Sequence, residues 1–477
     1  MAKSIKIIVF SFIFLLVLSI IIVVIANAVV ASKIENILQT SLPSEVTLTY
    51  DDLDVSILSG YVKLSNPNVT IIETSTNGKT IQIVQSAFIV DGLNIWRFLL
   101  NDEINIDAIH IQKPKVEYNF NKQTPSEKTK SSKSKGIQKD IKVDKITLTE
   151  GTFFINDAIN DSLIMTMKHV DFKISNVSID SETLLNKIPF NFESYELAFD
   201  DFYYQLNDFD NLKFDHAKLT NKELTFNKIK LYTKYSRKEL SQHIDVERDH
   251  MDLKIDELTI EDQEFGYKSD SLFFFSSAKV NLKYPNLNVF RDKLVNDDPV
   301  VKSLYSKMLR DLNFDLTLSE LLIENGVINY TEKVKSDNDG GTILFKNIDA
   351  TIRNIGNTYA APEKTAIDLT AIFMKNTPID IQWEFDVNNM NDHFAFKGDM
   401  GKLSAIDMNP FSVPNLGVKL EGELSKTYFT IDGDLNTSGI NLRMNYDDFR
   451  VMILNKDGKQ KNKFLSAVAN LFISKDS

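Results

Sequence analysis

The stretch INIDAIHI at residues 104–111 decides the fold of this chain, because its apolar residues follow a spacing that suits a bent strand. The same eight-residue motif, apolar-x-apolar-x-x-apolar-x-apolar, returns as IKVDKITL at 141–148, LKIDELTI at 253–260 and LTLSELLI at 316–323. Steps of two, three and two residues scatter side chains around a helix, whereas a strand with one extra residue keeps them on one face. The motif therefore predicts two short strand segments that are joined by a bulge or bend.

Each copy of the motif continues in the same way, with Pro, Gly or Gln three residues later and then an apolar-x-apolar triplet. The fourth position of the motif is Asp in three copies and Ser319 in the last. The triplets are Val116 and Tyr118, Phe153 and Ile155, Phe265 and Tyr267, and Ile328 and Tyr330. A recurring strand, turn and strand predicts an extended, divergent β array rather than a compact enzyme.

Composition excludes several classes of function. The 477 residues include no cysteine, so disulfides, zinc–thiolate sites and thiol nucleophiles are absent. A net charge of −12 makes wholesale nucleic-acid binding a poor fit, since the phosphate backbone selects basic surfaces. The length suits two to four compact domains or one elongated array.

The N-terminus carries the strongest local signal. Residues 7–25 contain no charge and are long enough to span a bilayer core of roughly 30 Å. Lys3 and Lys6 precede this stretch, so the positive-inside rule places the following chain across the membrane. We expect a retained transmembrane anchor over residues 1–33. A cleaved signal peptide is the alternative, because small residues at 26–28 fit a cleavage site.

The rest of the chain divides into four segments by pattern. We expect a first β module over 46–295, a connecting helix over 296–313, a second β module over 314–457 and an amphipathic C-terminal helix over 458–477. A Lys-rich stretch at 121–140 interrupts the first module and is typical of a disordered, solvated loop. Contact with anionic lipid headgroups is the alternative for that loop.

Catalytic motifs are not found, and we expect neither an enzyme nor a bound metal or cofactor. Phosphate-binding loops, G-x-S-x-G elbows and H-E-x-x-H pairs do not occur. The polar cluster His243, Asp245, Glu247 and Asp249, with His250 beside it, has the alternation of a strand face. A divalent metal site is possible there, but the solvated face of a half-buried strand is the favoured interpretation.

Several longer stretches carry a resemblance to a known family. They are VSILSGYVKL at 55–64, LNIWRFLL at 93–100 leading to Pro114, NPF at 409–411 and YDDFRV at 446–451. With these stretches behind an N-terminal anchor, the chain resembles the AsmA-like family of bacterial envelope proteins. It is related more distantly to TamB-type proteins and to eukaryotic bridge-like lipid transfer proteins. The resemblance covers essentially the whole chain.

The resemblance implies a mainly β fold, in which a transmembrane helix precedes an elongated, curled antiparallel β-sheet with a few short helices. It also implies a single-pass protein of the inner membrane, with most of the chain in the periplasm. Lipid binding or conduction along a hydrophobic groove would then serve outer-membrane biogenesis or envelope lipid homeostasis. The partners would be phospholipid acyl chains and an outer-membrane or envelope protein, but no nucleic acid.

Two other functions stay open on the sequence. A non-catalytic envelope scaffold or assembly factor would use the same strands without lipid, and an exported hydrolase would use the cluster from His243 to His250. For the groove, the candidate lining residues are the apolar positions of the four motif copies. They are Ile104, Ile106, Ile109, Ile111, Ile141, Val143, Ile146, Leu148, Leu253, Ile255, Leu258, Ile260, Leu316, Leu318, Leu321 and Ile323.

Overall fold

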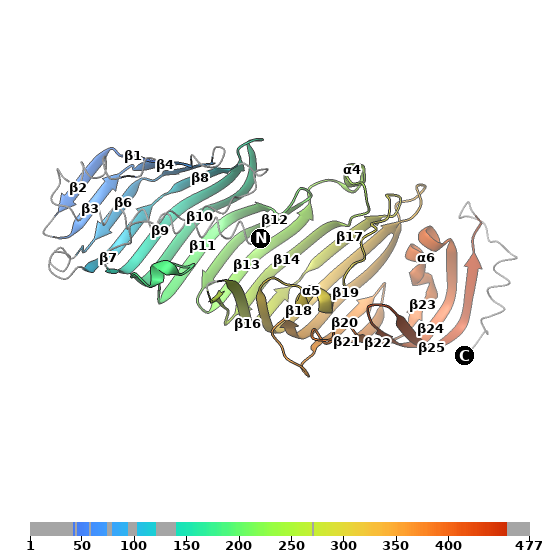
Figure 1. Cartoon of the computed structure of the whole chain (residues 1–477). Coiled ribbons are helices and arrows are strands. Elements are labelled where there is room, and N and C mark those ends of the chain that lie inside the picture. Colours follow the sequence, from blue (N-terminus) through green and yellow to red (C-terminus); the bar gives the residue numbers. More distant parts are fainter. Residues whose placement is uncertain are drawn as a thin grey trace. The chain divides into compact units, whose positions relative to one another are not determined.

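A computed structural model shows a mainly β protein, as the motif predicts. It describes residue 42 and residues 45–56, 59–73, 79–93, 103–120, 140–269 and 271–455. The chain forms two compact units, one up to residue 208 with residues 212–221, and one from residue 222 onward with residues 209–211. In both units long strands run side by side (Figure 1). The prediction of a mainly β fold is thus confirmed.

Unit 1 is a sheet of long, bent strands, most of which are divided in the middle. Strands β3 and β4 continue one another, as do β5 and β6, and β7 and β8; these three long strands pair antiparallel among themselves. The elements are β1 (Val46–Thr49), β2 (Asp52–Ser56), β3 (Tyr61–Ser65), β4 (Asn68–Glu73), β5 (Lys79–Val84), β6 (Ala87–Asp91), β7 (Glu103–Gln112), β8 (Lys115–Phe120), β9 (Asp140–Asp157), β10 (Ser162–Ile179), the short helix η1 (Thr183–Leu185), β11 (Ser194–Gln205) and β12 (Asp210–Thr220).

Unit 2 repeats this design with longer strands. Its elements are β13 (Glu223–Thr233), α4 (Arg237–His243), β14 (His250–Glu261), β15 (Glu264–Lys268), β16 (Leu272–Lys283), β17 (Asn286–Asp292), α5 (Tyr305–Arg310), β18 (Asp315–Lys333), β19 (Gly341–Gly356), β20 (Thr365–Phe373), β21 (Thr377–Phe385), β22 (Phe394–Met400), β23 (Leu403–Ser404), η2 (Ala405–Met408), α6 (Asn409–Leu416), β24 (Val418–Gly433) and β25 (Ser438–Ile453). Residues 334–340 join β18 to β19 as a hairpin, because the two strands pair antiparallel.

One parallel pairing interrupts the antiparallel order in each unit. In unit 1, β7 and β8 both run parallel to β9, and in unit 2, β16 and β17 both run parallel to β18. Parallel neighbours need a crossover connection, because a short hairpin joins only antiparallel strands. In unit 2 that crossover is residues 293–314. In unit 1 it is residues 121–139, the predicted Lys-rich loop, which lies outside the described residues.

The parallel pairing sets two copies of the motif side by side in register. Ile104 lies opposite Ile141, and Ile111 lies opposite Leu148. The triplets continue this register, with Val116 opposite Phe153. The motif therefore sets the register of the strand pair as well as indicating a strand, because both copies bend at the same place and still pair.

A left-handed residue follows each copy of the motif, directly before the Pro, Gly or Gln. Lys113, Glu150, Asp262 and Asn325 have φ between 49° and 54°. At the first two of these bends the backbone stays paired, because Lys113 N donates to the Thr149 carbonyl and Thr152 N donates to the Pro114 carbonyl. The predicted turn after the motif is thus a bend inside a long paired strand, where the chain continues in the same direction.

The middle of each motif faces a second left-handed residue on the neighbouring antiparallel strand. Asn176 lies between Ser175 and Val177, which face Lys145 and Val143, so it sits across from Asp144. Three further left-handed residues occupy the corresponding place opposite Asp107, Asp256 and Ser319, namely Gly92, Lys228 and Asn354. The predicted extra residue therefore exists, and each neighbouring strand supplies its own extra residue to match it.

The structure adds a fifth, degenerate copy of the motif at 275–282. It reads FSSAKVNL, is followed by Pro285, and pairs in register with 316–323. Tyr284, directly before Pro285, has a φ of 54° as in the other copies. Ser277 occupies an apolar position of the motif, which hid this copy in the sequence.

The connecting segment between the predicted modules differs from expectation. A helix over 296–313 would rise only roughly 27 Å. The crossover must return along β18, whose 19 residues span roughly 60 Å when extended. The chain is therefore mostly extended there, and only α5 at Tyr305–Arg310 is helical. Because β16 and β17 pair with β18, the compact units divide near residues 208–222 rather than at 296–313.

Three predicted features lie outside the described residues. They are the anchor over 1–33, most of the LNIWRFLL stretch at 93–100 and the C-terminal helix over 458–477. None of the helices in the described part of the chain has the length and apolar character that a membrane crossing requires.

Candidate functional site

Two unbroken rows of apolar residues cross ten strands of unit 2, from β13 to β25. We call them the apolar rows. Each row follows the cross-strand partners from one strand to the next, so its members share one face of the sheet. The first row is Phe226, Leu258, Leu282, Ile323, Ala350, Leu369, Ile381, Gly398, Phe429 and Leu442. The second row is Leu224, Ile260, Val280, Leu321, Ile352, Ile367, Trp383, Phe396, Ile431 and Ile440.

The rows are long enough to hold an extended apolar ligand. Ten strands at about 4.8 Å spacing place the first and last members roughly 43 Å apart. A single interruption, Gly398, has no side chain, and the ring of Phe429 covers it, because a Cβ there would meet Phe429 Cζ at 2.2 Å. The apolar surface is therefore continuous from one end of the rows to the other.

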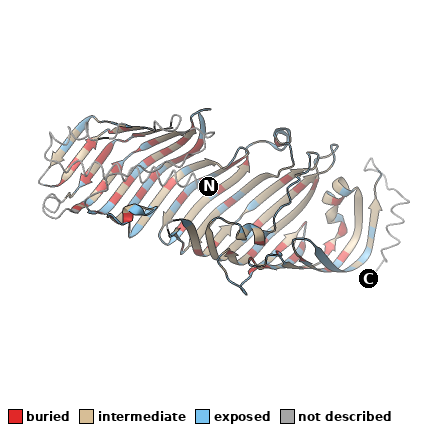
Figure 2. Ribbon diagram, viewed as in Figure 1, coloured by how far each residue is buried: buried red, intermediate tan, exposed pale blue. Residues whose placement is uncertain are grey.

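Most members of the apolar rows are only half-buried. Figure 2 shows intermediate burial along most strands of unit 2, whereas buried positions alternate along β7, β9 and β10 of unit 1. The exposed fraction rises to 62% at Ile440 and 53% at Leu442, at the β25 end. A sheet face in this state leaves apolar area in contact with water, which is unfavourable unless another layer or a ligand covers it.

Aromatic rings gather around Trp383 of the second row. Trp383 lies 5.9 Å from Phe385 and 6.1 Å from Phe396, centroid to centroid. Phe396 in turn stacks on Phe429 of the first row at 5.9 Å. Beside them, buried Ile348, Ala371 and Ile379 form the small core of this face. The rings widen the apolar surface without adding a hydrogen-bonding group other than the indole N–H.

The predicted lining residues fall into two groups. Those of the first two motif copies, in unit 1, are all at most 4% exposed and form a closed interior. Those of the last two copies, in unit 2, are half-buried apart from Ile255, which is buried. The last two copies are not neighbours, because β16 and β17 lie between β14 and β18 and contribute Leu282 and Val280 to the rows.

Sequence reasoning missed the larger part of the apolar rows, which lies on β19–β25. These strands lack the motif, and their apolar residues alternate simply, as in Ile367, Leu369 and Ala371 of β20. Alternation alone predicts a half-buried strand but does not state which strands pair. The available signal was the density of Phe and Trp at alternate positions in 381–396.

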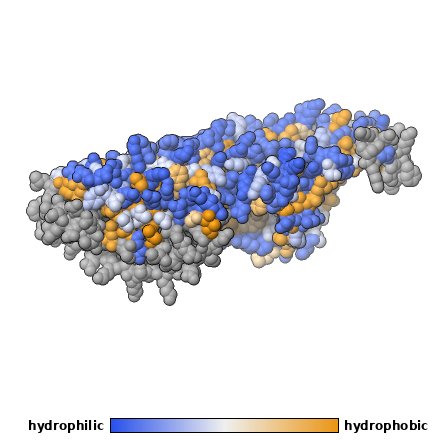
Figure 3. Space-filling view, turned by 90° about the horizontal axis from the view of Figure 1, so that it is seen from above, coloured by the Kyte–Doolittle hydropathy of each residue, from blue (hydrophilic) through white to orange (hydrophobic). Residues whose placement is uncertain are grey.

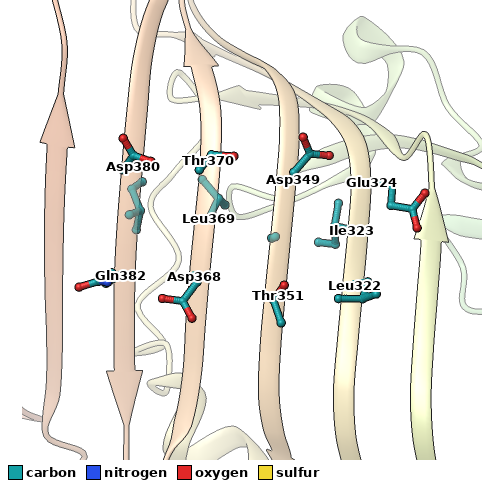
Figure 4. Close-up of a pocket in the computed structure, with 12 residues that line it drawn as sticks. Leu322, Ile323, Glu324, Asp349, Thr351, Asp368, Leu369, Thr370, Asp380 and Gln382 are labelled. Atoms are coloured by element: carbon teal, nitrogen blue, oxygen red, sulfur yellow. The ribbon is translucent and has the colours of Figure 1, made fainter.

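Strands β18–β21 carry a hollow of about 460 Å³, and its lining includes Ile323, Ala350, Leu369 and Ile381 of the first apolar row. Figure 4 shows Glu324, Asp349, Asp368 and Asp380 around it, one on each of four neighbouring strands. Asp368 is paired with Arg353 at 2.7 Å, and Asp349 accepts a hydrogen bond from the Asn325 amide. No group of three or more potential metal ligands with suitable geometry occurs among the described residues. The hollow is thus bordered by acidic and apolar residues together.

The polar cluster from His243 to His250 is not a strand face, so that expectation was wrong. Ser236 and Glu239 form a capping box that starts α4, and His243 ends this helix. The S-x-x-E spacing was the sequence signal for it.

The carboxylates of this cluster are used in ion pairs. Asp249 accepts two hydrogen bonds from Arg291 at 2.7 Å, and Glu247 pairs with Lys293 at 2.6 Å. The hydrogen bonds that Arg291 donates to Asp249 raise the pKa of the Arg291 guanidinium. Near it, burial and a hydrogen bond to Glu332 raise the pKa of Tyr330 to about 12, so its hydroxyl stays neutral at ordinary pH. These groups stabilise one end of unit 2.

Outside the apolar rows, the surface is mainly hydrophilic. Figure 3 shows hydrophilic residues over most of the visible face, with hydrophobic residues in smaller patches between them. A scan against protein-family models and a search of curated proteins found no match for this chain. The AsmA-like resemblance therefore stays a prediction from the sequence.

Proposed function

We propose that this protein binds the acyl chains of lipids along the apolar rows of unit 2 and so stores or conducts them. The observation that carries the proposal is the pair of continuous rows, most of whose members are half-buried or exposed. Each methylene group transferred from water to such a surface contributes about 0.8 kcal/mol, so binding needs no specific polar contact. This agrees with a site that offers many apolar side chains and few polar ones.

We propose the cellular setting on the sequence resemblance alone. In that proposal the protein is an AsmA-like component of the bacterial envelope, held in the inner membrane by residues 1–33, with most of the chain in the periplasm. Lipids taken up from the membrane would then support outer-membrane biogenesis or envelope lipid homeostasis. The reaction class is transfer without chemistry, and we propose no catalytic residue.

Lipid extraction tests the proposal directly. The full chain is purified in a mild detergent, extracted with organic solvent and examined by mass spectrometry for phospholipid. We expect phospholipid at a reproducible ratio to protein, above the amount that co-purifies with an unrelated anchored β protein. Protein that is folded and holds no more lipid than this control would contradict the proposal.

A second candidate function is a non-catalytic envelope scaffold. The closed interior of unit 1 favours it, because Ile104, Ile109, Ile141 and Ile146 are buried and leave no apolar surface for a ligand at the motif. On this alternative, unit 2 would place its apolar rows against a protein partner. A stable complex that excludes lipid from the rows would favour the scaffold over lipid binding.

A further inference from the structure

The crossover that joins β17 to β18, residues 293–314, lies along the apolar face of unit 2. We call it the strap. It contacts that face through Tyr305, whose ring lies 5.2 Å from the ring of Trp383 in an edge-on arrangement. Because the strap must return along β18, which spans roughly 60 Å, it has little slack and follows the sheet closely.

Polar contacts anchor the strap at its beginning. Lys293 pairs with Glu247 at 2.6 Å and with Asp297 at 3.1 Å. The side chain of Asn296 donates to the Asp245 carbonyl at 3.2 Å, and Glu247 N donates back to the Asn296 carbonyl at 2.7 Å. This end of the strap is fixed by several independent contacts.

A single latch holds the helical part of the strap to the turn between β21 and β22. Arg310 donates to Asp392 at 2.8 Å and to the carbonyls of Val387 and Asn389 at 2.8 and 3.2 Å. Ser306 donates to the same oxygen of Asp392, Oδ1, at 2.8 Å. Asp392 is 1% exposed, so the latch is made around a buried carboxylate.

The latch is incompletely satisfied. Both side-chain donors use Oδ1 of Asp392, while Oδ2 is buried without a hydrogen-bond partner. A buried charged oxygen without a partner is costly, which offsets part of what the ion pair contributes.

Four apolar side chains of the strap are exposed to solvent. Val300 and Val301 are 68% and 86% exposed, and Tyr305 and Met308 are more than half exposed. Exposed apolar residues in a cluster indicate an interaction surface. They lie on a segment that contacts the second apolar row through Tyr305 and Trp383, so the same apolar ligand can contact both.

We propose that the strap is a gate for the lipid site, closed by the latch between Arg310 and Asp392. When the latch opens, α5 moves off Trp383 and a phospholipid acyl chain enters the apolar rows; when it closes, Tyr305 and Met308 cover the chain. This inference rests on the proposed lipid binding. It adds where the acyl chain enters the apolar rows and which contact controls its entry.

Release of the latch gives the first test. Arg310→Met removes the ion pair with Asp392, whereas the matched variant Lys307→Met removes an exposed pair with Asp311 on the same helix. The full chain is mixed with phosphatidylcholine vesicles that contain pyrene-labelled phosphatidylcholine, and the rate of uptake is measured. We expect Arg310→Met to take up the probe roughly tenfold faster than wild type, since hydrogen bonds to charged groups are the stronger kind. Lys307→Met should match wild type.

A reversible disulfide across the latch gives the second test. This test does not require that Arg310→Met folds. The chain has no cysteine, so Ser306→Cys together with Asp392→Cys places the only two thiols at the latch. Oxidation should slow uptake of the probe strongly, and reduction of the same sample should restore it. Equal rates in the oxidised and reduced forms, with Arg310→Met also equal to wild type, would overturn the gate while leaving lipid binding intact. Absence of uptake by wild type and by every variant would overturn both proposals.

Discussion

Single residues determine where the strands of this protein bend. At each copy of the motif, a residue with positive φ precedes Pro, Gly or Gln, and a second one faces the middle of the motif across the strand pair. For most residue types this conformation costs roughly 1–2 kcal/mol. The cost recurs at the same position in five copies, which indicates that the bend is required by the sheet.

Glycine at a bend outside the motif, between Glu421 and Glu423 of β24, provides a stability test. Gly422 in β24 has a φ of 90°, and a Cβ there would lie 2.3 Å from the Asp448 carbonyl oxygen. We expect Gly422→Ala to lower the free energy of unfolding by at least about 1–2 kcal/mol. Urea denaturation followed by Trp fluorescence, in a Trp96→Phe background so that Trp383 alone reports, measures this in unit 2.

The matched control is Gly439→Ala on the partner strand β25. No atom lies within 4 Å of a Cβ at Gly439, and its φ is ordinary. Its unfolding midpoint should therefore equal or slightly exceed that of wild type. Equal effects of the two alanines would contradict the account of the bend.

At the scale of the element, the motif predicted strands well and their pairing only in part. The spacing of residues 104–111 and 141–148 established the bend and the apolar side, because a strand has a period of two. It did not show that the two copies pair in parallel. Parallel pairing depends on the path of the crossover between the copies, and the spacing of the motif does not predict that path. Ser277 hid the fifth copy for a different reason, because one buried polar residue breaks an apolar pattern without breaking the strand.

Ser277 itself gives a prediction that opposes the sequence pattern. Ser277→Val would restore the apolar motif, yet the hydroxyl donates to the Glu261 carbonyl at 2.8 Å and accepts from Lys279 N at 3.2 Å. We expect the variant to lower the free energy of unfolding by about 1–3 kcal/mol, because buried backbone groups lose their partner. The fluorescence assay used for Gly422 reports the change.

Ser276→Val is the control for that experiment. Ser276 is half-buried on the same strand, and valine is favoured in strands. We expect its free energy of unfolding to stay within about 0.5 kcal/mol of wild type or to rise. If Ser277→Val proves as stable as Ser276→Val, the hydroxyl contacts are not what holds this copy in register.

At the scale of the whole molecule, two compact units share one design but treat their apolar face differently. In unit 1 the motif residues are buried, as in Ile109 and Ile146, whereas in unit 2 the corresponding Leu321 and Ile323 are half-buried. The sequence could not reveal this difference, because both sets have the same residue types at the same spacing. Burial depends on what covers the face, which is a property of the fold beyond the strand.

The candidate site could also be predicted from the sequence only in part. The motif led to the correct face in unit 2 through Leu258, Ile260, Leu321 and Ile323. The aromatic part of the rows around Trp383 needed the strand order, and the strap needed the crossover. The proposed function therefore rests on the rows, and the motif is the part of them that the sequence makes visible.

The most direct measurement compares Ile381→Asp with Gln382→Asp by native mass spectrometry of bound phospholipid. Ile381 is half-buried in the first apolar row, and Gln382 is its exposed neighbour on the opposite face of β21. A charge in the row should repel acyl chains, since an unpaired carboxylate in an apolar site is costly.

Both variants carry the same added charge, and Trp383 fluorescence confirms that each has kept its fold. We predict that Gln382→Asp retains bound phospholipid at the wild-type level, while Ile381→Asp loses at least about nine-tenths of it, a tenfold change that requires roughly 1.4 kcal/mol. Folded Ile381→Asp that holds as much phospholipid as Gln382→Asp would contradict lipid binding along the apolar rows.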